Sequence, residues 1–237
     1  MPADHSPPGG LQGGALQLAL PFEPEPHYSE ADYIAAASNE AARTWLDREA
    51  EWPDRRLLLY GEAGSGKTHL LHRWREQRGA ILLSGPRLAW PTDLPLSGRI
   101  GVDIADAAPE EPLLHLLNAA HEAGGVVVLA SRPPPARWTV ALPDLASRLR
   151  AMPVAAIEHP EEALLRQLLG HLLAQRQLVV PEAVQDWLLL QLPRTPAALR
   201  EAAARLDRAA LAAGRRVTRP LAAAIVDELA PMWQPCD

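Results

Sequence analysis

A glycine-rich run in the first third of the chain has the residue types and spacing that bind a nucleoside di- or triphosphate. Its residues are Gly61, Glu62, Ala63, Gly64, Ser65, Gly66, Lys67 and Thr68. Glycines let the backbone curl so that N–H groups point at phosphate oxygens, the lysine ammonium reaches the β- and γ-phosphates, and the threonine hydroxyl binds Mg²⁺. The sequence therefore predicts a phosphate-binding loop (P-loop) that takes ADP or ATP and Mg²⁺ as cofactors.

The residues on either side of this loop supply the elements that such a site requires. The apolar run 57–60 predicts a buried strand that leads into the loop, and the pattern 69–77 predicts a helix that follows it. A helix that begins at the loop also directs the positive end of its dipole toward the phosphates. Because the pattern and its context agree, we favour phosphate binding over a glycine-rich loop that matches by chance.

An acidic residue at the end of a neighbouring strand completes a P-loop magnesium site. Asp103 follows the apolar stretch 99–102 and is the candidate, although a helix cap or a turn residue would also explain it. The next residue is Ile104, whose side chain cannot accept a proton from an attacking water, and Asp106 lies three positions beyond Asp103. We therefore expect weak or no intrinsic ATPase activity.

Composition divides the chain into three parts. Residues 1–26 are rich in proline and glycine, which is typical of a flexible tail. Residues 27–158 alternate short apolar runs with helical patterns, which predicts an α/β domain with a parallel five-stranded sheet. Residues 159–237 show helical patterns alone, so we expect a small helical bundle there. The predicted strands are 57–60, 81–83, 100–102, 126–129 and 154–157, and the predicted helices are 35–49, 69–77, 113–122, 161–176, 181–192, 196–213 and 218–229.

Charge, cysteine content and hydropathy exclude several classes of protein. The net charge is −6 and no long run of Lys or Arg is present, so we expect no direct sequence-specific binding to DNA. The one cysteine, Cys236, excludes a disulfide framework and favours a reducing compartment, which indicates a cytoplasmic protein. Residues 1–14 lack the basic start and apolar core of a signal peptide, and no apolar run is long enough to cross a membrane.

Three stretches together resemble the AAA+ module of the bacterial replication initiator DnaA and, among DnaA-related proteins, the Hda family of regulators. They are the P-loop, the stretch 129–134 and the stretch 142–149, which reads Leu-Pro-Asp-Leu-Ala-Ser-Arg-Leu. The resemblance extends over residues 16–230. It implies an α/β fold of the AAA+ P-loop NTPase type, with residues 159–237 as a C-terminal helical lid.

The resemblance gives roles to polar residues outside the P-loop. Asp103 matches the acid that binds Mg²⁺, and Ser131 lies at the strand end where the family reads the γ-phosphate (sensor 1), although a turn before two prolines would also explain this serine. Arg148 matches the arginine finger, which acts in trans on the nucleotide of a neighbouring subunit. A surface arginine paired with Asp144, one helical turn earlier, is the alternative, and Arg150 is a second candidate for the finger.

The sequence leaves two other roles of the family site undecided. A lid helix of the family carries an arginine that contacts the nucleotide (sensor 2), but the alignment places Ala197 there, with Arg194 and Arg200 about one turn away on either side. Tyr33 and Ile34 lie where the family packs the adenine base, although both residues would also suit a protein core. Contact between the lid and the nucleotide is therefore not assured by the sequence.

A short apolar stretch interrupts the N-terminal tail and resembles the peptide that docks on the bacterial sliding clamp, the beta subunit of DNA polymerase III. Its residues are Gln17, Leu18, Ala19, Leu20, Pro21 and Phe22. The glutamine would anchor the peptide, while Leu20 and Phe22 would enter a hydrophobic pocket of the clamp. The alternative is that this stretch packs on the α/β domain as a strand or staple.

Together these features predict a negative regulator of replication initiation. It would hold ADP or ATP, dock on the DNA-loaded clamp, and activate the hydrolysis of ATP by DnaA through Arg148. Residues 230–237, which follow the last predicted helix, leave no room for the DNA-binding domain that an initiator would need. The alternatives are an autonomous AAA+ ATPase of the helicase-loader type and a P-loop domain used only as an interaction module, and each is compatible with a homo-oligomer.

Overall fold

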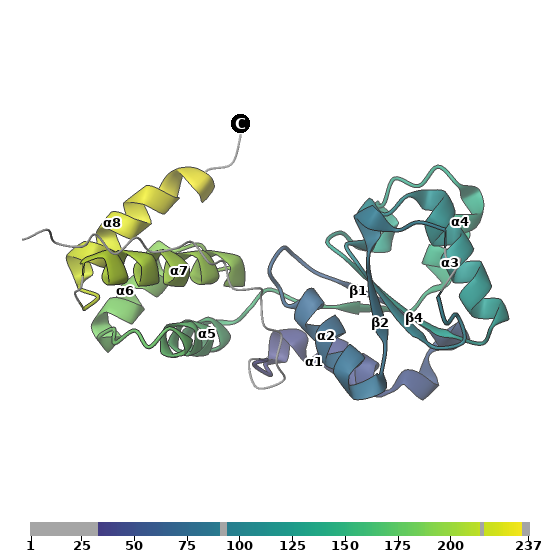
Figure 1. Ribbon diagram of the computed structural model, residues 1–237, viewed down its shortest axis with the longest axis horizontal. Coiled ribbons are helices and arrows are strands. Elements are labelled where there is room, and N and C mark those ends of the chain that lie inside the picture. Colours follow the sequence, from purple (N-terminus) through teal and green to yellow (C-terminus); the bar gives the residue numbers. More distant parts are fainter. Residues whose placement is uncertain (1–32, 91–93, 214–215, 234–237) are drawn as a thin grey trace, which may run out of the picture.

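Five strands form a single sheet, which is the centre of an α/β domain (Figure 1). The computed structural model describes residues 33–90, 94–213 and 216–233. The strands are β1 (Arg56–Tyr60), β2 (Ile81–Ser84), β3 (Arg99–Asp103), β4 (Val126–Ser131) and β5 (Val154–Ala156). They lie in the order β2-β3-β4-β1-β5, and every neighbouring pair is parallel. The prediction of a parallel five-stranded sheet is confirmed.

Helices cover both faces of this sheet and then form a second domain. Those of the α/β domain are α1 (Ala37–Asp47), α2 (Lys67–Arg78), α3 (Glu110–Glu122) and α4 (Pro143–Ala151). Those of the helical domain are α5 (Glu162–Gln175), α6 (Glu182–Gln191), α7 (Pro196–Ala213) and α8 (Arg219–Leu229). In the described part of the chain, no helix has the length and apolar character that crossing a bilayer requires.

The sheet is buried on both sides, as its sequence requires. Successive side chains of a strand point to opposite faces, so Leu57 and Leu59 pack with α1 and α2, whereas Leu58 packs with α3 and α4. All three leucines are fully buried. This two-sided burial explains why the strands are continuously apolar instead of alternating between apolar and polar residues.

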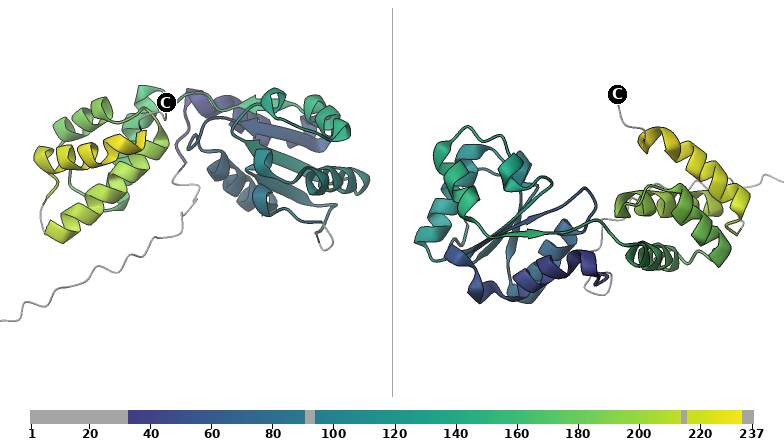
Figure 2. Two further views of the ribbon diagram at one scale, coloured as in Figure 1. Left: turned by 90° about the horizontal axis from the view of Figure 1, so that it is seen from above. Right: turned by 180° about the vertical axis from the view of Figure 1, so that it is seen from behind.

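The helical domain has a hydrophobic core of its own. Helices α5, α6, α7 and α8 contribute buried side chains to it, among them Leu169, Leu188, Leu206 and Leu229, which have no exposed surface. Figure 2 shows these helices gathered beside the α/β domain, not on either face of its sheet. The chain enters this domain through the connection between β5 and α5.

The segment before α1 packs against both domains. Tyr33 lies against the core formed by the sheet with α1 and α2, while Ile34 lies against the core of the helical domain. Asn39 holds the segment in place, because its Nδ2 donates to the Ile34 carbonyl (2.9 Å) and its Oδ1 accepts from the Ala36 N–H (3.1 Å). Asn39 is 4% exposed, so both hydrogen bonds are shielded from water.

The start of α1 is also tied to the connection that leads to α5. The Ser38 carbonyl accepts a hydrogen bond from the Glu158 N–H (2.8 Å), and Glu161 Oε1 accepts one from the Ala37 N–H (3.1 Å). Hydrogen bonds from its own backbone, from the Ser38 hydroxyl and from the Ala37 N–H lower the pKa of the Glu161 carboxyl. The N-terminal segment and the interdomain connection therefore form one joint.

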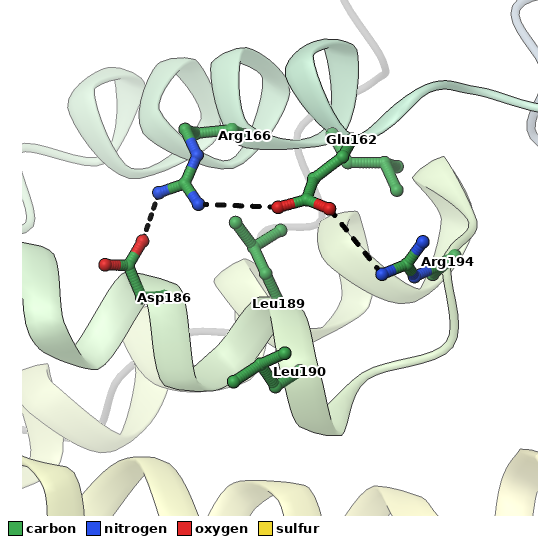
Figure 3. A pocket seen from close by; sticks show the side chains of 7 residues that line it. Glu162, Arg166, Asp186, Leu189, Leu190 and Arg194 are labelled. Atoms are coloured by element: carbon green, nitrogen blue, oxygen red, sulfur yellow. Dashed lines mark hydrogen bonds and ion pairs between the residues drawn. The ribbon is translucent and has the colours of Figure 1, made fainter.

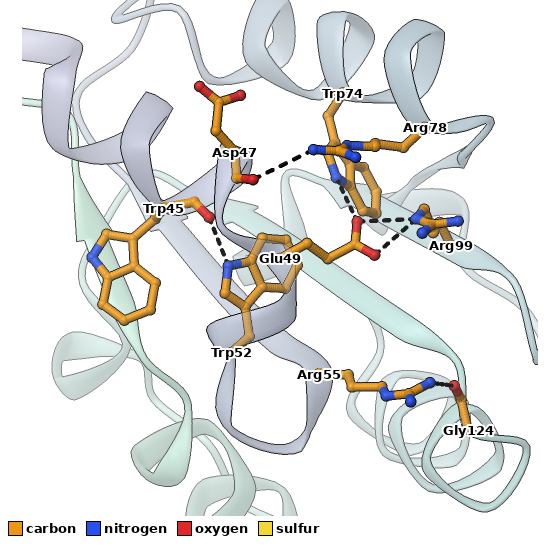
Figure 4. Close-up of polar contacts among 9 residues, drawn as sticks. All are labelled: Trp45, Asp47, Glu49, Trp52, Arg55, Trp74, Arg78, Arg99 and Gly124. Carbon is orange, nitrogen blue, oxygen red and sulfur yellow. Dashed lines mark hydrogen bonds and ion pairs between the residues drawn. The ribbon is translucent and has the colours of Figure 1, made fainter.

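Polar contacts lie where the strands of the sheet begin, at their amino-terminal ends (Figure 4). Glu49, in the 3₁₀-turn η2 (Glu49–Glu51), accepts hydrogen bonds from Arg99 Nε (2.9 Å) and from Trp74 Nε1 (3.3 Å). The bond to Glu49 raises the pKa of the Arg99 guanidinium. Arg99 begins β3 and Asp103 ends it, so this anchor fixes the strand that carries the candidate magnesium acid.

Replacing Asn39 by alanine should destabilise the protein. The change removes two shielded hydrogen bonds at the start of α1, which we expect to lower the free energy of unfolding by about 1–2 kcal/mol. Urea denaturation followed by circular dichroism measures this loss. Glu40→Ala, at the exposed neighbouring position, is the control and should change stability by less than about 0.5 kcal/mol. Equal midpoints for Asn39→Ala and the unmutated protein would contradict the anchoring role.

Candidate functional site

The P-loop lies between the end of β1 and the start of α2, where the sequence places it. Gly64 and Gly66 have φ angles of 76° and 104°, in the left-handed region that glycine adopts at little cost. Gly66 is the N-cap of α2, and no side chain bonds to this cap, so the first N–H groups of the helix are available to an anion. The loop has the form of a phosphate cradle.

Lys67 is held inside this loop. Its Nζ donates to the carbonyls of Gly61 (2.6 Å) and Glu62 (2.7 Å), and it lies 3.3 Å from the Ser65 hydroxyl. Lys67 is 8% exposed, and burial lowers the pKa of its ammonium, an effect that the nearby Asp103 carboxylate opposes. The ammonium now donates to neutral carbonyl oxygens, and a bound phosphate would offer it a charged acceptor instead.

The two predicted magnesium ligands are brought together. Thr68 Oγ1 donates to Asp103 Oδ2 over 2.7 Å, although these residues come from α2 and from the end of β3. Among the described residues, no three His, Cys, Asp or Glu side chains gather into a metal site of their own. A hydroxyl and a carboxylate are the hard oxygen donors that suit Mg²⁺, and phosphates and water would have to supply the remaining ligands. The residues present fit an ion that binds with the nucleotide.

The residue after Asp103 adopts a strained backbone. Ile104 has a φ of 54°, which for a β-branched residue costs on the order of 1–3 kcal/mol. Its carbonyl lies against Gly85, where a Cβ would come within 2.2 Å of the Ile104 oxygen. The side chain itself is 42% exposed and offers no acceptor beside the magnesium acid. Slow hydrolysis by the chain itself stays a prediction from the sequence.

Ser131 lies at the end of β4, directly beside the end of β1. Its side chain is fully buried, and its hydroxyl donates to the Pro133 carbonyl (2.8 Å) within the following turn. The hydroxyl oxygen can still accept a hydrogen bond, but donation to a phosphate would require the hydroxyl to rotate away from Pro133. Ser131 therefore lies at the strand end expected of sensor 1, and its hydroxyl also takes part in the turn that the sequence offered as the alternative.

Tyr33 and Ile34 lie beside the site, Tyr33 against the α/β domain and Ile34 against the helical domain. The Tyr33 ring meets the His69 ring edge to face, with centroids 5.0 Å apart, and lies 3.7 Å from the position that a Cβ on Gly66 would occupy. Its hydroxyl is buried without a hydrogen-bond partner among the described residues, and burial raises its pKa. The contact with His69 had no counterpart in the sequence analysis, although both His69 and Gly66 lie on one face of the helix start.

The lid meets the P-loop through Ala197. A Cβ on Gly64 would lie 3.0 Å from the Ala197 Cβ and 3.0 Å from its backbone nitrogen, so the start of α7 packs directly on the loop. Arg200, one turn further along α7, donates from Nη1 to the Gly64 carbonyl over a long 3.4 Å. Of the two arginines that flank the expected sensor 2 position, Arg200 is therefore the one directed to the P-loop.

Arg194, the other flanking arginine, is engaged within the lid (Figure 3). Its Nη2 lies 3.6 Å from Glu162, which in turn lies 3.7 Å from Arg166, and Arg166 also pairs with Asp186. All four side chains are about half exposed or more, so water and salt screen each pair and its contribution to stability is small. The ion pair nevertheless holds Arg194 to Glu162 of α5.

Arg148 lies far from the P-loop of its own chain. It is half-buried on α4, and its charge, after the effect of burial, lowers the pKa of Arg56, the residue that begins β1. The P-loop follows the other end of this strand, which spans about 13 Å. No described residue forms an ion pair with Arg148, Asp144 included, and Arg150 is exposed beside it. Arg148 and the P-loop of the same chain therefore lie at opposite ends of β1, and the role of Arg148 as an arginine finger stays a prediction.

The clamp-binding stretch predicted in the N-terminal tail lies outside the described residues. Its members are Gln17, Leu18, Leu20, Pro21 and Phe22. The interaction proposed for them stays a prediction from the sequence.

Comparisons with known proteins relate this chain to replication proteins. Residues 162–226, which run from the start of α5 into α8, match the family model described as "Hda, lid domain". The chromosomal replication initiator protein DnaA of Sphingopyxis alaskensis is 29% identical over 228 residues, an alignment that covers 84% of this chain and 50% of that protein. The chain thus spans about half the length of this curated relative.

Solved structures agree on the fold. Domain III of the Thermotoga maritima replication initiation protein DnaA matches with a TM-score of 0.72 at 20% identity, covering 86% of this chain and 97% of that one. AMPPCP-bound DnaA from Aquifex aeolicus matches with a TM-score of 0.62 at 18% identity, covering 80% of this chain and 68% of that one. These matches confirm the AAA+ P-loop fold with a helical lid that the sequence predicted.

Replacing Arg200 by alanine should weaken nucleotide binding more than replacing Arg194. Arg200 approaches the P-loop, whereas Arg194 is held by Glu162, so loss of the Arg200 charge should reduce affinity for ADP about threefold to tenfold. Titration of a fluorescent N-methylanthraniloyl-ADP with each variant measures the difference. Equal affinities for Arg200→Ala and Arg194→Ala would contradict the assignment of Arg200 as the lid contact.

Proposed function

We propose that this chain, an Hda-like protein related to the AAA+ module of DnaA, is a negative regulator of chromosomal replication initiation. It binds ADP or ATP with Mg²⁺, docks on the DNA-loaded sliding clamp, and stimulates ATP hydrolysis by DnaA. The observation that carries the proposal is the position of Arg148, unpaired with any described residue and at the opposite edge of the sheet from its own P-loop. The match of its lid to the Hda lid model supports the same function.

The nucleotide in this proposal has a conformational role. Lys67 and the N–H groups at the start of α2 bind the phosphates, and Thr68 with Asp103 binds the accompanying Mg²⁺. Because Ile104 follows Asp103, the chain lacks an adjacent base for an attacking water. The bound nucleotide then stabilises the contact between P-loop and lid and turns over slowly.

Arg148 supplies the catalytic contribution in trans. As the γ-phosphoryl group of ATP on DnaA is transferred to water, negative charge develops on its oxygens, and a guanidinium placed there stabilises that charge. Both Arg148 and Arg150 lie on the last turns of α4, so either can be presented by this helix. Of the two, Arg148 is the residue that matches the family finger, and we assign the role to it.

The N-terminal stretch provides the second contact of the regulator. Gln17, Leu18, Leu20, Pro21 and Phe22 have the pattern of a clamp-binding peptide, with a polar anchor followed by large apolar side chains. Attachment to the clamp would concentrate the regulator on DNA that has just been replicated, where DnaA must be inactivated. A cytoplasmic location and the absence of direct sequence-specific DNA binding follow from this mode of action.

A second candidate is an autonomous AAA+ ATPase of the helicase-loader type. The contact between Thr68 and Asp103 favours it, because these residues form an intact magnesium site. The backbone strain and apolar side chain at Ile104 count against it, as does the absence of an arginine at position 197. The turnover rate of the isolated protein separates the two functions, since an autonomous motor hydrolyses ATP without DnaA.

Replacing Arg148 by alanine should abolish the stimulation of DnaA. The variant removes the guanidinium that stabilises the transition state, so we expect stimulated hydrolysis to fall by about 10³-fold or more at saturating regulator. Release of inorganic phosphate from DnaA loaded with radioactive ATP, in the presence of clamp on DNA, measures the rate.

Arg150→Ala is the matched control, because it removes the same charge from the same helix. It should retain most of the stimulation and the same affinity for ADP. If Arg150→Ala loses the stimulation and Arg148→Ala keeps it, the finger is Arg150; if both variants keep it, this chain supplies no arginine finger.

Replacing Leu20 and Phe22 together by alanine should remove clamp binding. The change deletes the apolar anchors of the N-terminal peptide, so affinity for the clamp should fall by at least about a hundredfold, while affinity for ADP stays the same. Surface plasmon resonance with immobilised clamp measures the first quantity, and nucleotide titration measures the second. Unchanged clamp affinity would show that the stretch has another role, such as packing on the α/β domain.

A further inference from the structure

Glu110, the first residue of α3, holds the chain where it enters α4. Its Oε1 accepts a hydrogen bond from the Ala141 N–H (2.9 Å), and its Oε2 accepts one from the Leu142 N–H (2.8 Å). Leu142 is the N-cap of α4, and this helix has no side-chain cap of its own. A single carboxylate from a distant part of the chain therefore binds two consecutive N–H groups at the start of the helix that carries Arg148.

A second carboxylate, on the connection between β3 and α3, makes a similar contact. Asp106, in the 3₁₀-turn η5 (Ala105–Ala107), accepts a long hydrogen bond of 3.4 Å from the Arg132 N–H, just after β4. Asp106 thus bonds to the start of the connection between β4 and α4, and Glu110 bonds to its end. These two contacts are called the clasp below. Glu110 provides the shorter and bidentate part of this clasp.

An open pocket of about 410 Å³ lies between these two connections, lined by Asp106, Glu110, Arg137, Trp138 and Val140 among others. Apolar side chains of the connection that leads to α4, Leu142 among them, pack partly against the core on this face of the sheet. Beside the pocket, the Glu110 carboxylate adds the hydrogen bonds that hold the backbone of Ala141 and Leu142.

The remainder of α4 is short, so its start determines where its end points. The helix has nine residues, and Leu145 and Leu149 are its buried side chains against the sheet. Arg148 precedes Leu149 and projects from the same last turn. A shift at Leu142 rotates or tilts the helix about the two buried leucines and displaces the guanidinium at its far end.

We infer that Glu110 is a positioning residue that holds α4 and thereby sets the presentation of Arg148. It touches neither nucleotide nor reacting atoms, and it acts through the backbone of Ala141 and Leu142. The same connection begins at Asp103, so the clasp lies between the magnesium acid and the helix of the finger. This inference rests on the proposed function of Arg148.

Glu110→Gln is the variant that tests this role. The amide keeps the shape of the side chain but sets an NH₂ group against one of the two backbone N–H donors, which breaks the bidentate contact. We expect the maximal stimulation of DnaA to fall about fivefold to fiftyfold at saturating regulator, with ADP affinity and clamp affinity unchanged. Glu111→Gln, at the exposed neighbouring position, is the matched control and should behave like the unmutated protein.

The unfolding midpoint and the affinity for ADP separate positioning from general stability. If Glu110 acts by placing Arg148, Glu110→Gln lowers the maximal stimulation while its unfolding midpoint and ADP affinity match those of Glu111→Gln. A merely structural role predicts that stimulation falls in proportion to a lowered unfolding midpoint, together with a weaker affinity for ADP, and this result would overturn the inference. Glu110→Ala serves as a second variant, and its unfolding midpoint shows whether the fold persists without the carboxylate.

Failure of this inference can be told apart from failure of the proposed function. If Arg148→Ala loses stimulation while Glu110→Gln keeps it, α4 does not depend on Glu110 and the inference is wrong. If Arg148→Ala keeps full stimulation, Arg148 is not the finger, and the role inferred for Glu110 fails together with that assignment.

Discussion

The parallel direction of all five strands is the constraint on which the site depends. In a parallel sheet every strand has its carboxyl end on the same side and its amino end on the other. These two sides are called the carboxyl edge and the amino edge here. The P-loop after β1, Asp103 at the end of β3 and Ser131 at the end of β4 are gathered at the carboxyl edge by this rule alone. Arg56, beside Arg148, marks the amino edge. Separation of the P-loop from the candidate finger is therefore a property of the fold and not of any single side chain.

Unfavourable local features are concentrated at the carboxyl edge. Ile104 adopts a positive φ, the Tyr33 hydroxyl is buried without a described partner, and the Lys67 ammonium is largely withdrawn from water. Each of these costs free energy, and the two apolar cores of the sheet and the core of the lid supply the stability that tolerates them. A bound phosphate would give the Lys67 ammonium a charged partner in place of the two backbone carbonyls that it now contacts.

The sequence was sufficient wherever structure follows from local pattern. The sheet, the helix 196–213 and the pairing of the P-loop with Asp103 all follow from apolar periodicity and from the geometry of parallel strands. The helix predicted over 35–49 is shorter, because Asn39 bonds back to the chain before residue 37 and the far end tightens into a 3₁₀-turn. Such ends depend on individual hydrogen bonds, which periodicity does not encode.

Contacts between distant connections could not be predicted from the sequence in this way. Nothing in the sequence distinguishes Arg200 from Arg194, since the difference arises from the ion pair with Glu162 and from the approach of α7 to Gly64. Glu110 reads as an ordinary acid in the first turn of a helix, which its dipole would favour anyway. Its contact with Ala141 depends on how the loops that follow β3 and β4 lie beside each other around an open pocket.

The contact between Gly64 and Ala197 connects the lid to the P-loop. A small residue at the start of α7 lets the lid rest on the P-loop, and Arg200 reaches the same loop from one turn further along. A motor must open and close this contact at each turnover, whereas a regulator needs it only to hold one conformation. In the proposed function, Ile104 beside the magnesium acid makes hydrolysis slow in the same chain after the lid has closed. The role proposed for the nucleotide is that of a structural ligand that keeps the α/β domain and lid together, while the role proposed for Arg148 is to act on another molecule.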